Sequence, residues 1–194
     1  MSLRRFITLS VLCAGVSMIG ACAPSVIPPD PNASHPLRAS PEVYTLVNLH
    51  PDEDDQELSS VNYQDDGLIP LCTPIRVTFL NTEELQFTVL ASGRSYRYIF
   101  HDTMKMTPGE HVARFFGTRC DRSMVQTLAP IDQQGIREGR ALVGMSKEAV
   151  LLAIGYPPEH ATPSLDSDEW RYWLGKLDTM MVIFAEGRVV ELKD

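Results

Sequence analysis

The first 21 residues follow a different pattern from the rest of the chain, and this limits which part can fold into a domain. Arg4 and Arg5 precede an apolar run over 6–19, and two small residues close it. The run is shorter than the roughly 20 residues that span a bilayer. A basic start, a short apolar run and a small-residue exit are typical of a secretory signal. We therefore expect residues 1–21 to be a signal peptide that is removed.

The sequence at the end of this segment, Ile19-Gly20-Ala21-Cys22, resembles the bacterial lipobox, in which the cysteine is acylated and becomes the first mature residue. The alternative is an ordinary secretory signal with a cysteine nearby. Each buried methylene contributes about 0.8 kcal/mol, so two or three acyl chains would hold a domain on a membrane. The residue after Cys22 is Ala23 rather than aspartate, which resembles outer-membrane cargo. We expect lipidation at Cys22 and a periplasm-facing protein anchored in the outer membrane.

The net charge limits the classes of partner that this chain can bind. The chain has 17 basic and 25 acidic side chains, a formal charge of −8, which becomes −10 when Arg4 and Arg5 leave with the signal. Phosphate contacts need a basic surplus, so no nucleic-acid partner is expected. Acyl chains, rather than charge, must attach such a chain to an anionic lipid surface.

A proline-rich segment follows the expected lipid site. Six prolines occur between Ala23 and Pro41, mixed with Ser, Asn and Asp. Such a composition buries little apolar surface. The sequence predicts a lipidated, extended tether over 22–42, with folded structure beginning near Val43.

Runs that alternate apolar and polar residues at period two come next. They cover 75–80, 85–89 and 96–100, with short turns between them, and a similar run lies at 44–49. This alternation is typical of half-buried strands, and turns of that length join antiparallel neighbours. The pattern predicts a small antiparallel β-meander.

A helix is predicted after the meander. Thr107 suits a cap, Pro108 suits the first helical position and Glu110 completes a capping box, with the helix ending at Gly117. Together these elements predict a small β-rich domain with one helix over 43–129.

The last part predicts an α+β domain over 130–194. Ser146 caps a helix over 147–154, and Gly155 stops it. A short helix over 132–138 is an additional option. Three strand-like runs follow, at 170–173, 180–184 and 189–192. The predicted fold class is α+β: a meander with one helix, then a helix plus a three-stranded antiparallel meander.

Two cysteines remain after Cys13 leaves with the signal and Cys22 is acylated. These are Cys72 and Cys120, and an oxidising compartment favours a disulfide between them. Free structural cysteines and a nucleophilic cysteine are the alternatives, the latter as a hydrolase that uses Cys120 with His111.

The sequence contains none of the common catalytic motifs. The histidines are scattered, and no nucleophile elbow, phosphate loop or dinucleotide fingerprint occurs. The acidic run 52–55 lacks the glycine and distal glutamate of a twelve-residue calcium loop. We expect no metal, no cofactor and no enzymatic activity.

The aromatic strand 170–173 has two interpretations. Trp170 and Tyr172 share one face and Trp173 lies on the other. One ring packs on the helix over 147–154 while a loop covers the other, or the strand presents a partner surface of exposed Trp, Tyr and Arg. The second interpretation predicts Trp170, Arg171 and Tyr172 as contact residues.

The residues from Gly144 to Val190 resemble the BamE family (SmpA/OmlA), small lipoproteins of the outer-membrane assembly machinery. The resemblance rests on a glycine-methionine-serine helix start, Gly155-Tyr156-Pro157, the aromatic strand, Val182-Ile183-Phe184 and Gly187-Arg188-Val189. It implies a BamE-like helix-plus-meander fold and a non-enzymatic role. The expected function is that of an outer-membrane lipoprotein that binds or scaffolds an envelope protein.

An alternative function assigns the activity to the β-rich unit. Its strands carry arginines and tyrosines that suit a polar ligand such as peptidoglycan. This set is Arg76, Arg94, Arg97, Tyr96 and Tyr98.

Overall fold

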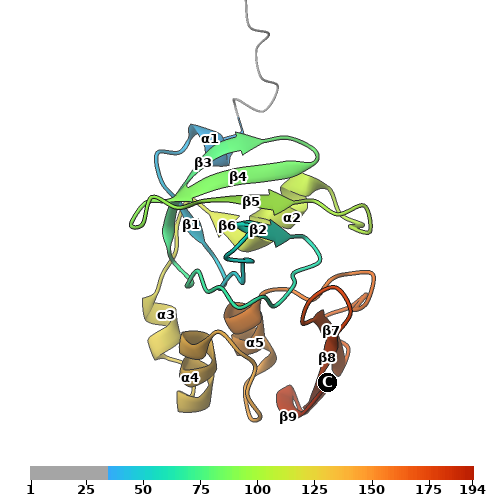
Figure 1. The fold of residues 1–194 in the computed structure, drawn as a ribbon. Coiled ribbons are helices and arrows are strands. Elements are labelled where there is room, and N and C mark those ends of the chain that lie inside the picture. The colour runs from blue at the N-terminus through green and yellow to red at the C-terminus, as the bar shows by residue number, and fades with distance from the viewer. Residues whose placement is uncertain (1–34) are drawn as a thin grey trace, which may run out of the picture.

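Two hydrophobic cores organise residues 35–194, the part of the chain that this computed structural model describes. The expected signal peptide, the lipid site at Cys22 and the tether up to residue 34 lie outside the described residues. The two cores belong to two lobes that are stacked on each other (Figure 1). Within residues 35–194, no helix has both the length and the apolar character needed to cross a membrane.

The first lobe is built on a curled six-stranded sheet in the order β2-β5-β4-β3-β1-β6. The predicted meander is confirmed, because β3, β4 and β5 are sequential antiparallel neighbours. The sheet is mixed, however, because β2 pairs in parallel with β5. A strand of three residues is too short to show alternation, so the sequence did not predict β2. The strands are β1 Val43–Thr45, β2 Glu57–Ser59, β3 Pro74–Leu80, β4 Glu84–Val89, β5 Ser95–Ile99 and β6 Phe116–Gly117.

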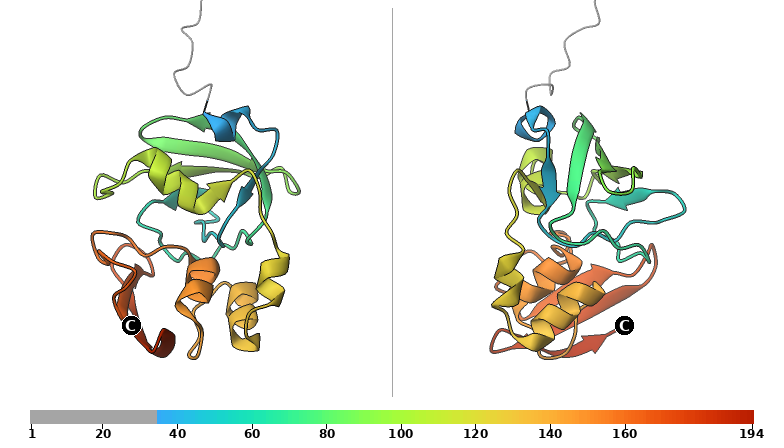
Figure 2. Two further views of the ribbon diagram at one scale, coloured as in Figure 1. Left: turned by 180° about the vertical axis from the view of Figure 1, so that it is seen from behind. Right: turned by 90° about the vertical axis from the view of Figure 1, so that its left-hand side faces the viewer.

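Helix α2, Pro108–Phe115, covers one face of this sheet (Figure 2). It starts with the predicted capping box: the Glu110 backbone N–H donates to Thr107 Oγ1 at 3.3 Å, and the Thr107 N–H donates to the Glu110 carboxylate at 2.9 Å. The box satisfies amides that an uncapped helix leaves unpaired. Its Val112 and Phe115 enter the first core.

The second lobe confirms the predicted helix followed by a three-stranded antiparallel sheet, in the order β7-β8-β9. Ser146 Oγ accepts from the Ala149 N–H at 3.2 Å and caps α5, which ends before Gly155. Two helices that precede α5 complete the lobe. The elements are α3 Ser123–Gln126, α4 Pro130–Glu138, α5 Lys147–Ile154, β7 Glu169–Trp173, β8 Thr179–Ala185 and β9 Arg188–Lys193.

Two glycines explain how α4 fits against its neighbours. Gly135 lies inside the helix where any Cβ would collide with the thioether of Met145. Gly139 ends the helix with φ +66°, a left-handed conformation that favours glycine. The absence of a side chain at these two glycines therefore permits the close packing of α4.

The proline-rich segment is ordered at its end, so the prediction of an extended tether up to residue 42 is wrong for its last part. Pro36–Ala39 forms a helical turn, α1, and Leu37 is buried in the first core. One well-placed apolar side chain is enough to dock the segment. In Figure 1, α1 lies on the side of the first lobe that faces away from the second.

The predicted boundary at residue 129 does not separate two independent units. Leu71 from the first predicted unit belongs to the second core, and Cys72 and Cys120 pack against that core. Asn62 donates through its side-chain amide to the carbonyls of Ile154 and Tyr156 at 2.7 and 2.9 Å. The lobes therefore share buried polar contacts.

Candidate functional site

The outward side of the three-stranded sheet is the candidate binding surface. Alternate residues of a strand point to opposite faces, and the helices cover the inner side (Figures 1 and 2). The register places Arg171, Met181 and Lys193 side by side across the three strands. The next row holds Glu169, Ile183 and Glu191. We call these six residues the outer face.

The outer face mixes partly exposed apolar groups with charges. Met181 and Ile183 lie at its centre and are half-buried, while Arg171 is exposed and its Nε lies 3.3 Å from Met181 Sδ. Lys193 pairs with Glu191 at 3.2 Å. Arginine and methionine are enriched in protein–protein interfaces, and the rim of such an interface is polar.

The predicted contact residues Trp170 and Tyr172 do not belong to this surface, so that part of the prediction is wrong. Their side chains point to the inner face and are 1% and 0% exposed. Tyr172 donates its hydroxyl to the Gly155 carbonyl at 3.0 Å. Trp170 packs on Phe184 with ring centroids 4.6 Å apart. The core interpretation is confirmed for both rings.

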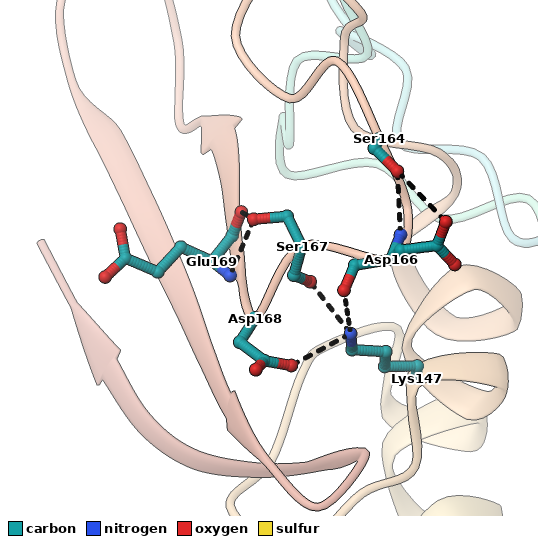
Figure 3. A network of polar contacts seen from close by, with 6 residues as sticks. All are labelled: Lys147, Ser164, Asp166, Ser167, Asp168 and Glu169. Atoms are coloured by element: carbon teal, nitrogen blue, oxygen red, sulfur yellow. Dashed lines mark hydrogen bonds and ion pairs between the residues drawn. The ribbon is translucent and has the colours of Figure 1, made fainter.

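Lys147, the first residue of α5, contacts the loop that precedes β7 (Figure 3). Its ammonium donates to the carbonyls of Asp166 and Ser167 and to the carboxylate of Asp168, at 2.8 to 3.2 Å. The same group lies 5.7 Å from the centre of the Trp170 ring, a cation–π distance. These contacts tie the loop before β7 to α5, and Trp170 beneath the ammonium is buried in the second core.

Trp173 is covered by a loop, as the core interpretation also expected. Its ring stacks on His160 with centroids 6.3 Å apart. Its backbone carbonyl accepts from the Gln64 N–H at 2.8 Å. The start of the β7–β8 turn is therefore tied to the first lobe, and Arg171 is the exposed member of the predicted contact set.

The structure joins Cys72 and Cys120 in a disulfide, with Cα atoms 5.4 Å apart. In this state Cys120 has no thiolate to act as a nucleophile. His111, the other half of the hypothetical dyad, faces Tyr98 instead, with its Nε2 2.8 Å from the tyrosine hydroxyl. The structure does not bring Cys120 and His111 together as a catalytic pair.

Burial makes His111 a source of acid sensitivity. Desolvation, helped by nearby Arg114, lowers the pKa of His111 to about 4. A histidine in the unfolded chain titrates near pH 6.5, so between pH 6.5 and about 4 the unfolded state binds a proton that the folded state excludes. The stability that the folded protein gains from a neutral His111 is fully present above pH 6.5 and is lost as the pH falls toward 4.

We therefore expect the urea midpoint of the wild-type protein to fall as the pH drops from 7 to 4, and to fall less in His111→Gln. Part of the pH dependence should persist in the variant, because burial also lowers the pKa of His50. Urea titrations at pH 7, 5.5 and 4 measure this. Equal pH dependence in both proteins would contradict the assignment.

The alternative ligand set in the first lobe is largely occupied by internal contacts, which corrects its predicted role. Tyr96 and Tyr98 are 4% and 1% exposed. Arg94 pairs with Glu53. Arg97 pairs with Glu84 at 3.0 Å and with Glu57 at 3.5 Å, while Arg76 is exposed. The three arginines and two tyrosines do not form one open polar surface.

No group of three or more His, Cys, Asp or Glu side chains in residues 35–194 is placed to hold a metal ion. Comparison of the chain with protein-family models, with curated proteins and with solved structures found no match.

Sequence reasoning missed the centre of the outer face. Met181 and Ile183 were assigned only to a strand. Their alternation with the buried Val182 and Phe184 was the available signal, since it places them opposite the core.

Proposed function

We propose that this protein is a lipid-anchored, non-enzymatic binding module of the bacterial cell envelope, and that the outer face of its second lobe docks an envelope protein. The observation that carries the proposal is the row Arg171, Met181 and Lys193, which lies on the sheet side opposite the core. A sheet with one buried face and a mixed apolar and charged second face offers a flat surface of the kind that protein partners cover.

The cellular part of the proposal rests on the lipobox at Cys22 and on the disulfide. Disulfides persist in oxidising compartments such as the periplasm, where an outer-membrane lipoprotein facing inward would fold. The finer proposal, a BamE-like lobe that takes part in outer-membrane protein assembly, rests on the resemblance of residues 144–190.

The arrangement of the lobes supports a docking role. In Figure 1, α1 and the start of the described chain lie at one end of the molecule, and the β7–β9 sheet lies in the other lobe. An anchor that precedes α1 would leave the outer face on the lobe that is more distant from the point of attachment.

Photo-crosslinking in intact cells tests the proposal. A photoreactive amino acid at Lys193 of the lipidated, full-length protein should give one dominant adduct, and mass spectrometry should identify its partner as an envelope protein. Met181→Glu places a charge at the centre of the outer face and should reduce the adduct about tenfold, a cost of about 1.4 kcal/mol. Loss of lipid labelling in Cys22→Ser tests the anchor separately.

The matched control is Thr78→Glu, which adds the same charge on an exposed strand position of the first lobe. This variant should crosslink like the wild type. An adduct that survives Met181→Glu, or that is lost equally in Thr78→Glu, would contradict docking at the outer face.

A further inference from the structure

A cavity of about 540 Å³ opens between α3, α4 and the segment that leads to Cys72. This volume lies within the range of small-molecule sites, about 300 to 1,000 Å³. Its apolar side is formed by Leu71, Val125 and Ile136, of which Leu71 and Ile136 are 5% and 7% exposed. The cavity therefore offers a floor that belongs to the second core.

Two arginines provide the charge at this cavity. Arg122 lines it from the start of α3 and Arg137 from the end of α4, and no acidic side chain of the described chain lines it with them. Within residues 35–194 neither arginine forms an ion pair, and Glu138, the acidic residue that follows Arg137, pairs with Arg140 at 2.6 Å. In a chain of net charge −8, this is a locally positive, partly apolar site.

Both guanidinium groups retain donors for a ligand. Arg122 donates Nη2 to the Leu71 carbonyl at 3.0 Å, and Arg137 has a long contact of 3.5 Å from Nη1 to the Gln133 carbonyl. A guanidinium has five N–H donors in a planar fork that matches a carboxylate. The first contact holds Arg122 beside the apolar floor and leaves most of its donors unused.

The floor is held in place before any ligand arrives. The Leu71 N–H donates to Asn48 Oδ1 at 2.7 Å, and the Asn48 amide donates to the Ile136 carbonyl at 2.7 Å. The Cys72–Cys120 disulfide ties the residue after Leu71 to a position two residues before Arg122. Fixed walls reduce the ordering cost of binding.

We propose that this cavity binds a small anion that carries a carboxylate beside a short apolar group. The carboxylate contacts Arg122 and Arg137, and the apolar group covers Leu71, Val125 and Ile136. A free fatty acid and the free C-terminus of a peptide with an apolar last residue share this chemistry. In Figure 2, α3 and α4, which line the cavity, lie on the other side of α5 from the β7–β9 sheet, and the cavity shares no lining residue with the outer face.

Calorimetric titration of the unlipidated chain 23–194 tests the proposal, because this chain contains both cores and the disulfide and needs no detergent. Octanoate should bind with a stoichiometry of one and at least about tenfold more tightly than 1-octanol, its neutral counterpart. N-acetyl-alanyl-leucine should likewise bind more tightly than its C-terminal amide. The acid that binds more tightly identifies the source as a fatty acid or a peptide terminus.

The double variant Arg122→Gln/Arg137→Gln removes both charges and keeps an amide donor near the Leu71 carbonyl. It should bind the acids at least about tenfold more weakly, with an unchanged urea midpoint. Arg140→Gln is the matched control, since Arg140 lies just beyond α4 outside the cavity lining and should bind as the wild type does. Equal binding of octanoate and octanol together with equal binding of the peptide acid and amide, or equal loss in the control, would overturn the proposal.

Discussion

Removing the Cys72–Cys120 disulfide is expected to lower the free energy of unfolding by about 4 kcal/mol. The bridge closes a loop with a sequence separation of 48 residues, and the loop-entropy relation gives that value for a loop of this length. It also joins the two places where the chain passes between the lobes, one before β3 and one after β6. The unfolded chain gains this freedom when the bridge is absent.

Urea unfolding of the oxidised wild type and of Cys72→Ala/Cys120→Ala measures the difference. Adding a reductant should lower the wild-type midpoint and leave that of the double variant unchanged, which separates loss of the bridge from the loss of packing. Mass mapping without reduction should recover the peptides of Cys72 and Cys120 joined. Free thiols in the native oxidised protein would contradict this.

Replacing Asn48 by leucine is the second large effect that we expect, with a loss of about 3 kcal/mol. Asn48 is 1% exposed and joins three segments through its side chain. Its amide donates to the carbonyls of Ile136 and Ala153 at 2.7 and 3.1 Å, and its Oδ1 accepts from the Leu71 N–H. Leucine leaves that buried N–H without a partner and removes both hydrogen bonds to the carbonyls.

The two tryptophans allow the unfolding of the second lobe in Asn48→Leu to be followed separately from that of the whole protein. Trp170 and Trp173 both lie in the second lobe, so tryptophan fluorescence follows this lobe while far-ultraviolet circular dichroism follows the whole fold. The two transitions should coincide in the wild type and separate in Asn48→Leu. Asn81→Leu is the same exchange at a half-buried position before β4, where Oδ1 accepts only from the nearby Glu83 and Glu84 N–H groups of the first lobe, and it should keep the transitions coincident. Coincident transitions in Asn48→Leu would contradict the role of Asn48 as the junction.

Local signals predicted most of the elements but not the way they are joined. The capping box at Thr107 and the cap at Ser146 each involve residues within one turn, so sequence placed α2 and α5 accurately. The parallel pairing of β2 with β5 and the bonds of Asn48 join residues far apart in the chain. Nothing local in the sequence signals such pairings.

At the candidate sites, too, local sequence predicted the residue types but not the features that depend on tertiary packing. The residue types of the strand 170–173 indicated large rings on both faces, but which ring is buried depends on where the helices pack. All three residues were predicted to be exposed. Arg171 is exposed, whereas Trp170 and Tyr172 are buried. The cavity beside Arg122 and Arg137 arises from elements that meet only in three dimensions, so no spacing in the sequence indicates it.

The contact of Asn48 with α5 also affects the order in which the chain can fold. Asn48 and Ala153 are 105 residues apart, and a chain synthesised from its N-terminus presents Asn48 long before α5. The meander β3–β5, with its neighbouring pairings, has no need to wait, since local contacts form early. The segment 46–73 can form its full set of hydrogen bonds only once α5 is present. Until α5 is present, the side chains of Asn48 and Asn62 therefore lack the carbonyls of Ala153 and Ile154 that they bind in the folded protein.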